Sequence, residues 1–104
     1  MKCTLVRYKV KADRAIENER YIADVFSALK TAQPSGLHYA SFKLEDGVSF
    51  VHLVLTETSE GSIPLHTLPT FQAFVSTVKD RCEEMPVAVD LNEVGSYGFF
   101  EKQA

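Results

Sequence analysis

The chain has 104 residues, of which 45% are hydrophobic and 24% charged, and its formal net charge is −3. This length and composition indicate a single domain over residues 1–104 and exclude a disordered chain. Lysine and arginine form no continuous run, which argues against nucleic acid as a partner. The sequence shows no signal-type leader and no apolar run of about 18 residues, so we expect a cytoplasmic protein with no membrane partner.

The two cysteines, Cys3 and Cys82, have no CxxC spacing, and the three histidines are not at metal-ligand spacing. We therefore expect two free thiols, a reducing compartment and no metal site.

A strand and a long helix are the first predicted elements. Residues 3–11 alternate and are rich in β-forming side chains, which predicts the strand. The helix is predicted over residues 13–33 and ends before the breaker at 34–36. Its apolar face consists of Ala15, Ile22, Val25, Phe26 and Leu29. A solvated face is the expected setting of Glu17, Asn18, Glu19 and Arg20.

A hairpin and a second helix follow. Residues 37–44 and 48–57 predict two strands joined by a turn at Asp46-Gly47. A polar connection from Thr58 to Ser62 leads into the stretch SIPLHTLPTFQAF, residues 62–74. The second helix is predicted over about 69–84, and residues 87–100 predict a last strand. Its apolar stripe is Phe71, Phe74, Val75, Val78 and Cys82.

This order, βαββαβ, predicts a ferredoxin-like α+β fold with a four-stranded antiparallel sheet and both helices on one face. The turn at Asp46-Gly47 sets Ser41 opposite His52 and Tyr39 opposite Val54, and opposed residues share a face. The uniformly apolar set is expected to face the helices: Ala40, Phe42, Val51, Leu53 and Leu55, with Val6, Tyr8 and Val10 of the first strand. The mixed set is expected on the other face: Tyr39, Ser41, Lys43, Phe50, His52 and Val54, with Leu5, Arg7 and Lys9. A register slip of one residue would exchange the two faces.

The expected outer face is too apolar for a surface in water. Two copies that pack these faces together would bury it and enclose a space, and small-molecule sites are apolar pockets with a few polar groups. We therefore expect a homodimer with an internal pocket for a small hydrophobic or aromatic molecule.

The segment SIPLHTLPTFQAFVSTV, with Pro69 and Phe71-Gln72-Ala73-Phe74, and the closing NEVGSY, residues 92–97, resemble the antibiotic biosynthesis monooxygenase group of dimeric α+β barrel proteins. The likeness covers about residues 3–99. Two departures are visible. His66 lies one residue closer to Phe71 than the histidine usual in the family, and the chain has no tryptophan. The Asn, Trp and His set of the haem-degrading members cannot be assembled, so we do not predict haem breakdown.

The resemblance implies a homodimer in which two ferredoxin-like protomers form a dimeric α+β barrel, each protomer with its own pocket. It also implies oxidation of polycyclic phenols by O₂ without metal or flavin, hence no cofactor. Other members of the group isomerise, decarboxylate or only bind, and a fold does not decide the reaction.

Two residues are the catalytic candidates. His52 titrates in the right range for a general acid or base, and the alternative is a sheet histidine hydrogen-bonded in the interior. Arg7 can hold a carboxylate or an enolate, and the alternative is a salt bridge across the dimer. The substrate-binding candidates are Tyr39, Ser41, Phe50, His66 and Tyr97. His66 would line a pocket mouth, or it is a surface residue.

Two functions from different classes remain open. The first is a cofactor-independent monooxygenase-like enzyme that acts on a small aromatic or quinol-type molecule in a pocket of the homodimeric barrel. The second is a non-catalytic dimeric small-molecule-binding or stress-related protein. Ligand binding without O₂ consumption would favour the second.

Overall fold

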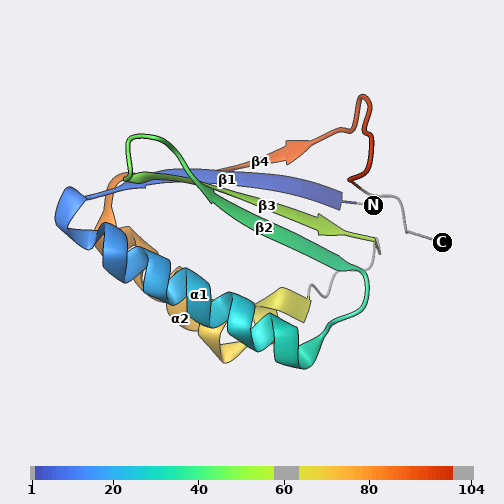
Figure 1. Ribbon diagram of the computed structural model, residues 1–104, viewed down its shortest axis with the longest axis horizontal. Helices are drawn as coiled ribbons and strands as arrows, with labels where there is room; N and C mark the ends of the chain where they lie inside the picture. Colours follow the sequence, from blue (N-terminus) through green and yellow to red (C-terminus); the bar gives the residue numbers. More distant parts are fainter. Residues whose placement is uncertain (1, 58–63, 100–104) are drawn as a thin grey trace.

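The computed structural model describes residues 2–57 and 64–99. In chain order it contains β1 (Lys2–Val10), η1 (Ala12–Arg14), α1 (Ala15–Ala32), β2 (Leu37–Lys43), β3 (Ser49–Thr56), η2 (Pro64–Thr67), α2 (Pro69–Arg81) and β4 (Cys82–Leu91). The strands form one antiparallel sheet in the order β2-β3-β1-β4, and both helices cover the same face of it (Figure 1). The predicted ferredoxin-like βαββαβ fold is confirmed. The predicted connection from Thr58 to Ser62 lies outside the described residues.

The end of the chain differs from the prediction. Helix α2 stops at Arg81, and β4 begins at Cys82 and ends at Leu91, so the strand predicted over 87–100 starts five residues too late. Pro86 misled the prediction because it was taken as the end of the helix. It lies inside β4, which is an edge strand paired only with β1, and an edge strand tolerates proline.

The predicted strand over NEVGSY is also wrong. No strand follows Leu91 in the part of the chain that the structure describes. Residues 92–99, which we call the arm, turn back over the sheet on the side opposite the helices (Figure 1). Asparagine, glycine and serine favour turns, and Ser96 Oγ donates to Glu93 Oε2 across 2.6 Å within the arm.

The predicted hairpin register is confirmed, because Ser41 pairs with His52 and Tyr39 with Val54. The turn itself lies one residue earlier than predicted. The N–H of Gly47 donates to the carbonyl of Leu44, so Glu45 and Asp46 are the central residues and Gly47 follows with a φ of 77°. Only a residue without a Cβ adopts that conformation at no steric cost.

The predicted faces of β2 and β3 are exchanged. Phe50 and His52, expected on the outer face, point toward the helices and are 2% and 3% exposed. The first strand decides this: Tyr8, correctly expected to face the helices, pairs with Phe50, and Val6 pairs with His52. Because opposed residues share a face, Phe50 and His52 have to follow Tyr8 and Val6.

The core therefore lies between the helices and the side of the sheet that carries Tyr8, Phe50 and His52. Its fully buried hydrophobic members are Tyr8, Val10, Val25, Phe50, Leu65, Phe74, Val78 and Cys82. The opposite side, which we call the open face, has none of the described helices over it. Its paired rows are Phe42, Val51, Arg7 and Val87, then Ala40, Leu53, Leu5 and Val89.

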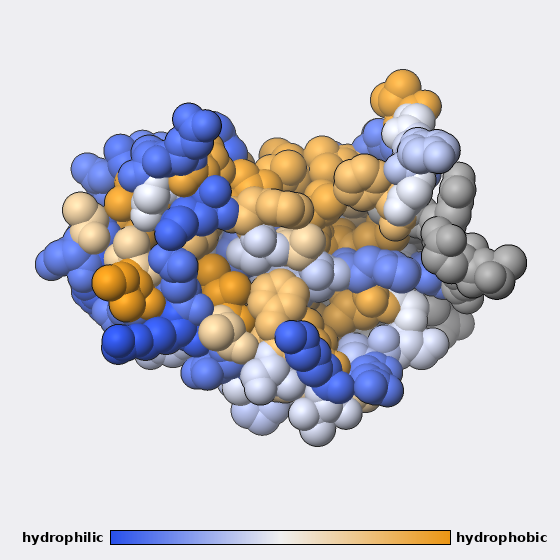
Figure 2. Space-filling view, in the orientation of Figure 1, coloured by the Kyte–Doolittle hydropathy of each residue, from blue (hydrophilic) through white to orange (hydrophobic). Residues whose placement is uncertain are grey.

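Figure 2 shows hydrophobic side chains gathered over the sheet, in the hollow beside the arm at the upper right. Phe42, Val87 and Val89 of the open face are 55%, 51% and 45% exposed. No described helix has the length and apolar content that crossing a membrane requires.

Candidate functional site

His52 lies at the centre of a buried polar cluster between the sheet and the helices. Its Nε2 is 2.8 Å from the hydroxyl of Tyr8, and its Nδ1 is 2.7 Å from the hydroxyl of Tyr39. Ser41 Oγ, from the neighbouring strand, is 3.4 Å from Nε2. The structure therefore brings together three of the predicted site residues, His52, Tyr39 and Ser41, and adds Tyr8.

The cluster continues into both helices. Asn18 of α1 donates from Nδ2 to the Tyr8 hydroxyl across 2.9 Å, and Arg81 of α2 donates from Nε to Asn18 Oδ1 across 3.0 Å. Arg81 Nη1 also donates to Thr77 Oγ1 across 2.8 Å. The residues Tyr8, Asn18, Arg81, His52 and Tyr39 form what we call the polar network.

The prediction that Asn18 is solvated is wrong, since Asn18 is 0% exposed. The sequence contains a pattern that indicates this burial. Positions 15, 18, 22, 25 and 29 follow one another at steps of three and four residues, so Asn18 falls on the apolar stripe of the helix. A polar residue on such a stripe needs hydrogen-bond partners, and Arg81 and Tyr8 supply them. Arg81 carries the same signal, because positions 71, 74, 78 and 81 also follow one another at steps of three and four residues.

Burial controls the protonation of the polar network. It lowers the pKa of His52 to about 4, so the imidazole is neutral at neutral pH. It also raises the pKa of Tyr8 and of Tyr39 above the usual value, so both hydroxyls keep their protons. A hydrogen bond from Asn18 and the charge of Arg81 oppose the rise at Tyr8.

Aromatic rings surround the network. Phe50, a predicted substrate-binding residue, stacks on Tyr8 at 5.5 Å and is part of the packed core. Phe26 stacks on Tyr39 at 4.9 Å, and Phe74 lies 5.4 Å from the imidazole of His52. These rings keep water from His52 and account for its low pKa.

A cavity of about 230 Å³ opens at Tyr39, between the end of α1 and the start of β2. It is lined by Phe26, Leu29, Lys30, Gln33, Pro34, Leu37 and Tyr39. A second cavity of about 260 Å³ lies on the other side of Phe26 and includes Ser41 in its lining. Tyr39 and Ser41 thus link the polar network to the surface on the helix side of the sheet.

Arg7 does not belong to this site. It is exposed and sits on the open face between Val51 and Val87, whereas His52 faces the helices. The prediction that Arg7 and His52 share the outer face of the sheet is therefore wrong. The reason is the exchange of faces in β3, because Arg7 keeps the outer position expected for it and His52 does not.

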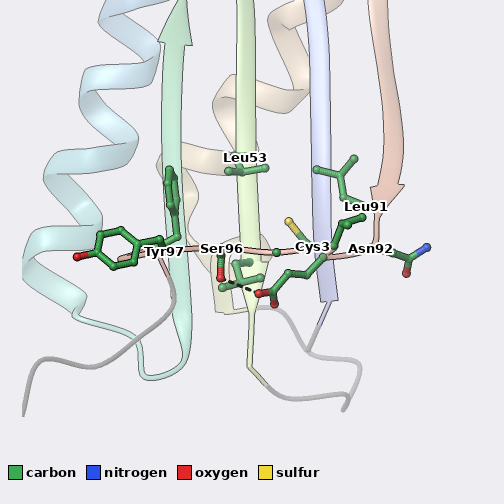
Figure 3. Close-up of a pocket in the computed structure, with 11 residues that line it drawn as sticks. Cys3, Leu53, Leu91, Asn92, Ser96 and Tyr97 are labelled. Carbon is green, nitrogen blue, oxygen red and sulfur yellow. Dashed lines mark hydrogen bonds between the residues drawn. The ribbon is translucent and has the colours of Figure 1, made fainter.

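Tyr97 is also on the other side of the sheet. It belongs to the arm, is 91% exposed and lines the largest cavity, about 620 Å³. This cavity lies between the arm and the strand ends that carry Cys3, Leu53 and Leu91, and Figure 3 shows the arm crossing these strands. Its described lining includes no histidine, so the largest cavity and the polar network are separate sites.

His66 stays outside both sites. It lies in η2, is exposed, and stacks on Phe71 with ring centroids 5.6 Å apart. Its carbonyl accepts a hydrogen bond from Gln72 Nε2 across 3.0 Å, which fixes the start of α2. Among the described residues, no three His, Cys, Asp or Glu side chains lie close enough together to hold a metal ion.

Several solved structures with this arrangement are named as antibiotic biosynthesis monooxygenases. A candidate antibiotic biosynthesis monooxygenase from Bacteroides thetaiotaomicron matches with a TM-score of 0.78 at 14% identity, over 97% of this chain and 95% of its own. Another, from Nitrosomonas europaea, matches with a TM-score of 0.76 at 16% identity, over 91% of this chain and 100% of its own. SnoaB, a cofactor-independent oxygenase from Streptomyces nogalater, matches with a TM-score of 0.68 at 14% identity, over 93% of this chain and 97% of its own.

The chain has the antibiotic biosynthesis monooxygenase fold. The resemblance inferred from residues 62–78 and 92–97 is confirmed at this level. The sequence matches no protein-family model, and no curated protein matches it significantly. At such low identity the likeness establishes the monooxygenase fold alone, and the chemistry has to be argued from the residues of this chain.

Proposed function

We propose that the protein is a cofactor-independent monooxygenase-like enzyme whose substrate is a small aromatic or quinol-type molecule. The observation that carries this proposal is the position of Tyr39. Its hydroxyl is held by the buried imidazole of His52, and its ring lines a cavity open to the surface. The same fold in a cofactor-independent oxygenase supports the reaction class.

The cavity limits the size of the substrate. Pockets for drug-sized ligands measure about 300–1,000 Å³, and the cavity at Tyr39 measures about 230 Å³. A single aromatic ring is therefore the preferred occupant. The ring would pack on Phe26 and Leu37, with its oxygen at the Tyr39 hydroxyl and the ammonium of Lys30 at the rim to favour an ionised phenol.

In this scheme the ionised phenol supplies the electrons. One oxygen atom of O₂ enters the ring, the other leaves as water, and the substrate gives up all four electrons that the reduction requires. Tyr39 holds the reacting oxygen and His52 orients Tyr39. His52 thus acts through Tyr39 and takes no direct part in proton abstraction.

The test compares two tyrosines on opposite sides of the sheet. Tyr39→Phe removes the hydroxyl at the proposed site, and we expect at least a 100-fold loss of O₂ consumption with simple quinols, on the order of the effect of removing one essential hydrogen-bonding group. Tyr97→Phe removes the hydroxyl of the arm and should leave O₂ consumption unchanged. Equal rates for Tyr39→Phe and the unmodified protein would contradict the proposal.

We further infer that a second copy of the chain covers the open face. The support is the exposure of Phe42, Val87 and Val89 over an apolar sheet, because contiguous apolar surface of this kind marks an interface. The homodimer is then the barrel expected from the sequence, with the cavity beside the arm inside it. No nucleic acid or membrane is part of this proposal.

The second candidate function is binding without catalysis, and the cavity of about 620 Å³ favours it. That cavity is of the right size for a small hydrophobic molecule, and its floor, Leu53, Leu55 and Leu91, is apolar. If quinols bind without O₂ consumption, and if Tyr97→Phe weakens binding while Tyr39→Phe does not, this second function is the correct one.

We also propose a cytoplasmic location. Cys3 and Cys82 are both free thiols, and a reducing compartment keeps thiols unpaired.

A further inference from the structure

The hydrogen bonds of the polar network run in one direction from donor to acceptor, and Arg81 sets this direction. A guanidinium donates hydrogen bonds and accepts none. Because Arg81 Nε lies 3.0 Å from Asn18 Oδ1, the amide oxygen of Asn18 has to face Arg81. The amide nitrogen then faces Tyr8 and donates to its hydroxyl oxygen across 2.9 Å.

This donated bond decides which nitrogen of His52 carries the proton. The Tyr8 hydroxyl has one proton, and with Asn18 donating to its oxygen that proton is directed at His52 Nε2, 2.8 Å away. Nε2 is therefore an acceptor. A neutral imidazole has only one N–H, which must be on Nδ1, and it donates to the Tyr39 hydroxyl across 2.7 Å.

We propose that Arg81 is a positioning residue that holds His52 in the Nδ1–H tautomer through Asn18 and Tyr8, so that the Tyr39 hydroxyl becomes a hydrogen-bond donor to a ligand. No second hydrogen bond joins Tyr39 Oη to the residues that the structure describes, so its proton can turn to the cavity. The ligand oxygen is then an acceptor: a phenolate, an enolate or a quinone carbonyl. The ligand part of this inference rests on the proposed function, whereas the tautomer does not.

The setting of Arg81 supports a directing role. Its side chain is 0% exposed, and none of the described salt bridges pairs it with a carboxylate. The guanidinium lies 4.3 Å from the ring of Tyr21 and 5.6 Å from that of Phe74, and its Nη2 has no hydrogen-bond partner among the described residues. A buried cation without a carboxylate in direct contact is costly, and an apolar side chain would fill the same volume at lower cost.

The charge of Arg81 also strengthens each later hydrogen bond of the polar network. A hydroxyl or an imidazole that accepts a hydrogen bond becomes a stronger donor in the next one, and this effect is larger in a site of low dielectric. The Tyr39 hydroxyl at the end of the network is therefore a better donor than an isolated phenol. That property suits the stabilisation of a negative oxygen.

The deciding experiment reverses the network with Asn18→Asp. The new carboxylate only accepts, so it would take hydrogen bonds from Arg81 and from the Tyr8 hydroxyl. The Tyr8 oxygen would then accept from His52 Nε2–H, and Nδ1 would accept from Tyr39. The change is nearly isosteric and gives Arg81 a counter-ion, so we expect the variant to fold.

The readout is the ¹⁵N resonances of the His52 ring in protein labelled at histidine, assigned with His52→Gln. We expect a protonated Nδ1 in the unmodified protein and a protonated Nε2 in Asn18→Asp. Thr77→Val removes the other hydrogen bond of Arg81 without touching the path to His52, and should keep the Nδ1–H tautomer. An Nε2–H tautomer in the unmodified protein, or no change in Asn18→Asp, overturns the proposal.

The ligand part is tested with 4-nitrophenol, whose ionised form is coloured. The unmodified protein should lower the pKa of the bound phenol, and Asn18→Asp should raise it, since Tyr39 would then present an acceptor. If nitrophenol does not bind but the tautomer exchanges as expected, the proposed function and the ligand part are contradicted while the role of Arg81 stands.

Discussion

At the scale of single residues, the imidazole of His52 is the group whose protonation most opposes folding. Its hydrogen bonds to Tyr8 and Tyr39 need a neutral ring with one donor and one acceptor nitrogen. A proton on both nitrogens would turn Nε2 into a donor facing the Tyr8 hydroxyl, and would place a charge next to the rings of Tyr39 and Phe74. Protonation must therefore disrupt the polar network.

This predicts a pH dependence of stability. The pKa of His52 is about 4 in the folded protein against 6.5 for an ordinary histidine. The unfolded state binds the proton more readily, so the free energy of unfolding is highest above pH 6.5 and falls as the pH drops toward 4, by about 3 kcal/mol in all. Urea unfolding at a series of pH values measures it.

The matched variants are His52→Gln, which should flatten this slope, and His66→Gln, an exposed histidine, which should keep it. A slope between pH 4 and 6.5 that survives in His52→Gln would show that another group is responsible.

At the scale of elements, the end of α1 carries a backbone conformation that its residue disfavours. Gln33 caps the helix with φ 47° and ψ 55°, and its N–H donates to the carbonyl of Leu29 across 2.8 Å. The left-handed conformation brings the Cβ of any residue other than glycine close to the backbone, and glycine is the usual residue at this position.

We expect Gln33→Gly to raise the free energy of unfolding by roughly 0.5–1 kcal/mol, since the steric relief exceeds the added entropy of glycine in the unfolded chain. Thermal and urea unfolding measure the gain. Gln33→Ala keeps the Cβ and should bring no gain, so equal effects of the two variants would argue against strain at this cap.

At the scale of the whole molecule, one side of the sheet is covered by helices and the other is not. The open face places the charged Arg7 between the apolar side chains of Val51 and Val87. The arm crosses only one end of this surface (Figure 3). A protomer of this shape leaves Val87 and Val89 of β4 exposed to solvent, which is the basis of the proposed homodimer.

Two matched substitutions test that dimer. Val89 on the open face is 45% exposed and Val75 on α2 is 49% exposed, so each can become glutamate at a similar surface position. We expect Val89→Glu to shift the protein from dimer to monomer in sedimentation at micromolar concentration, and Val75→Glu to leave it dimeric. An unmodified protein that sediments as a monomer would contradict the proposed interface.

The sequence by itself determined the order of the elements and the pairing of β2 with β3. Apolar residues repeat every three or four positions in the helices and every second position in the strands, and these local periods are visible in the chain. The hairpin register followed from the Asp46-Gly47 turn region, and His52, chosen from the sequence as a candidate residue, lies in the polar network.

Only the tertiary structure decided which side of the sheet the helices cover. Alternation shows which residues share a face, but both faces of this sheet carry apolar side chains, so the pattern does not say which one is inside. For the same reason, the structure places His52 on the face opposite Arg7 and in one network with Asn18 and Arg81. Both residues are far from His52 in the sequence, and the packing of α1 and α2 brings them together. The network depends on this long-range packing, and no local pattern encodes it.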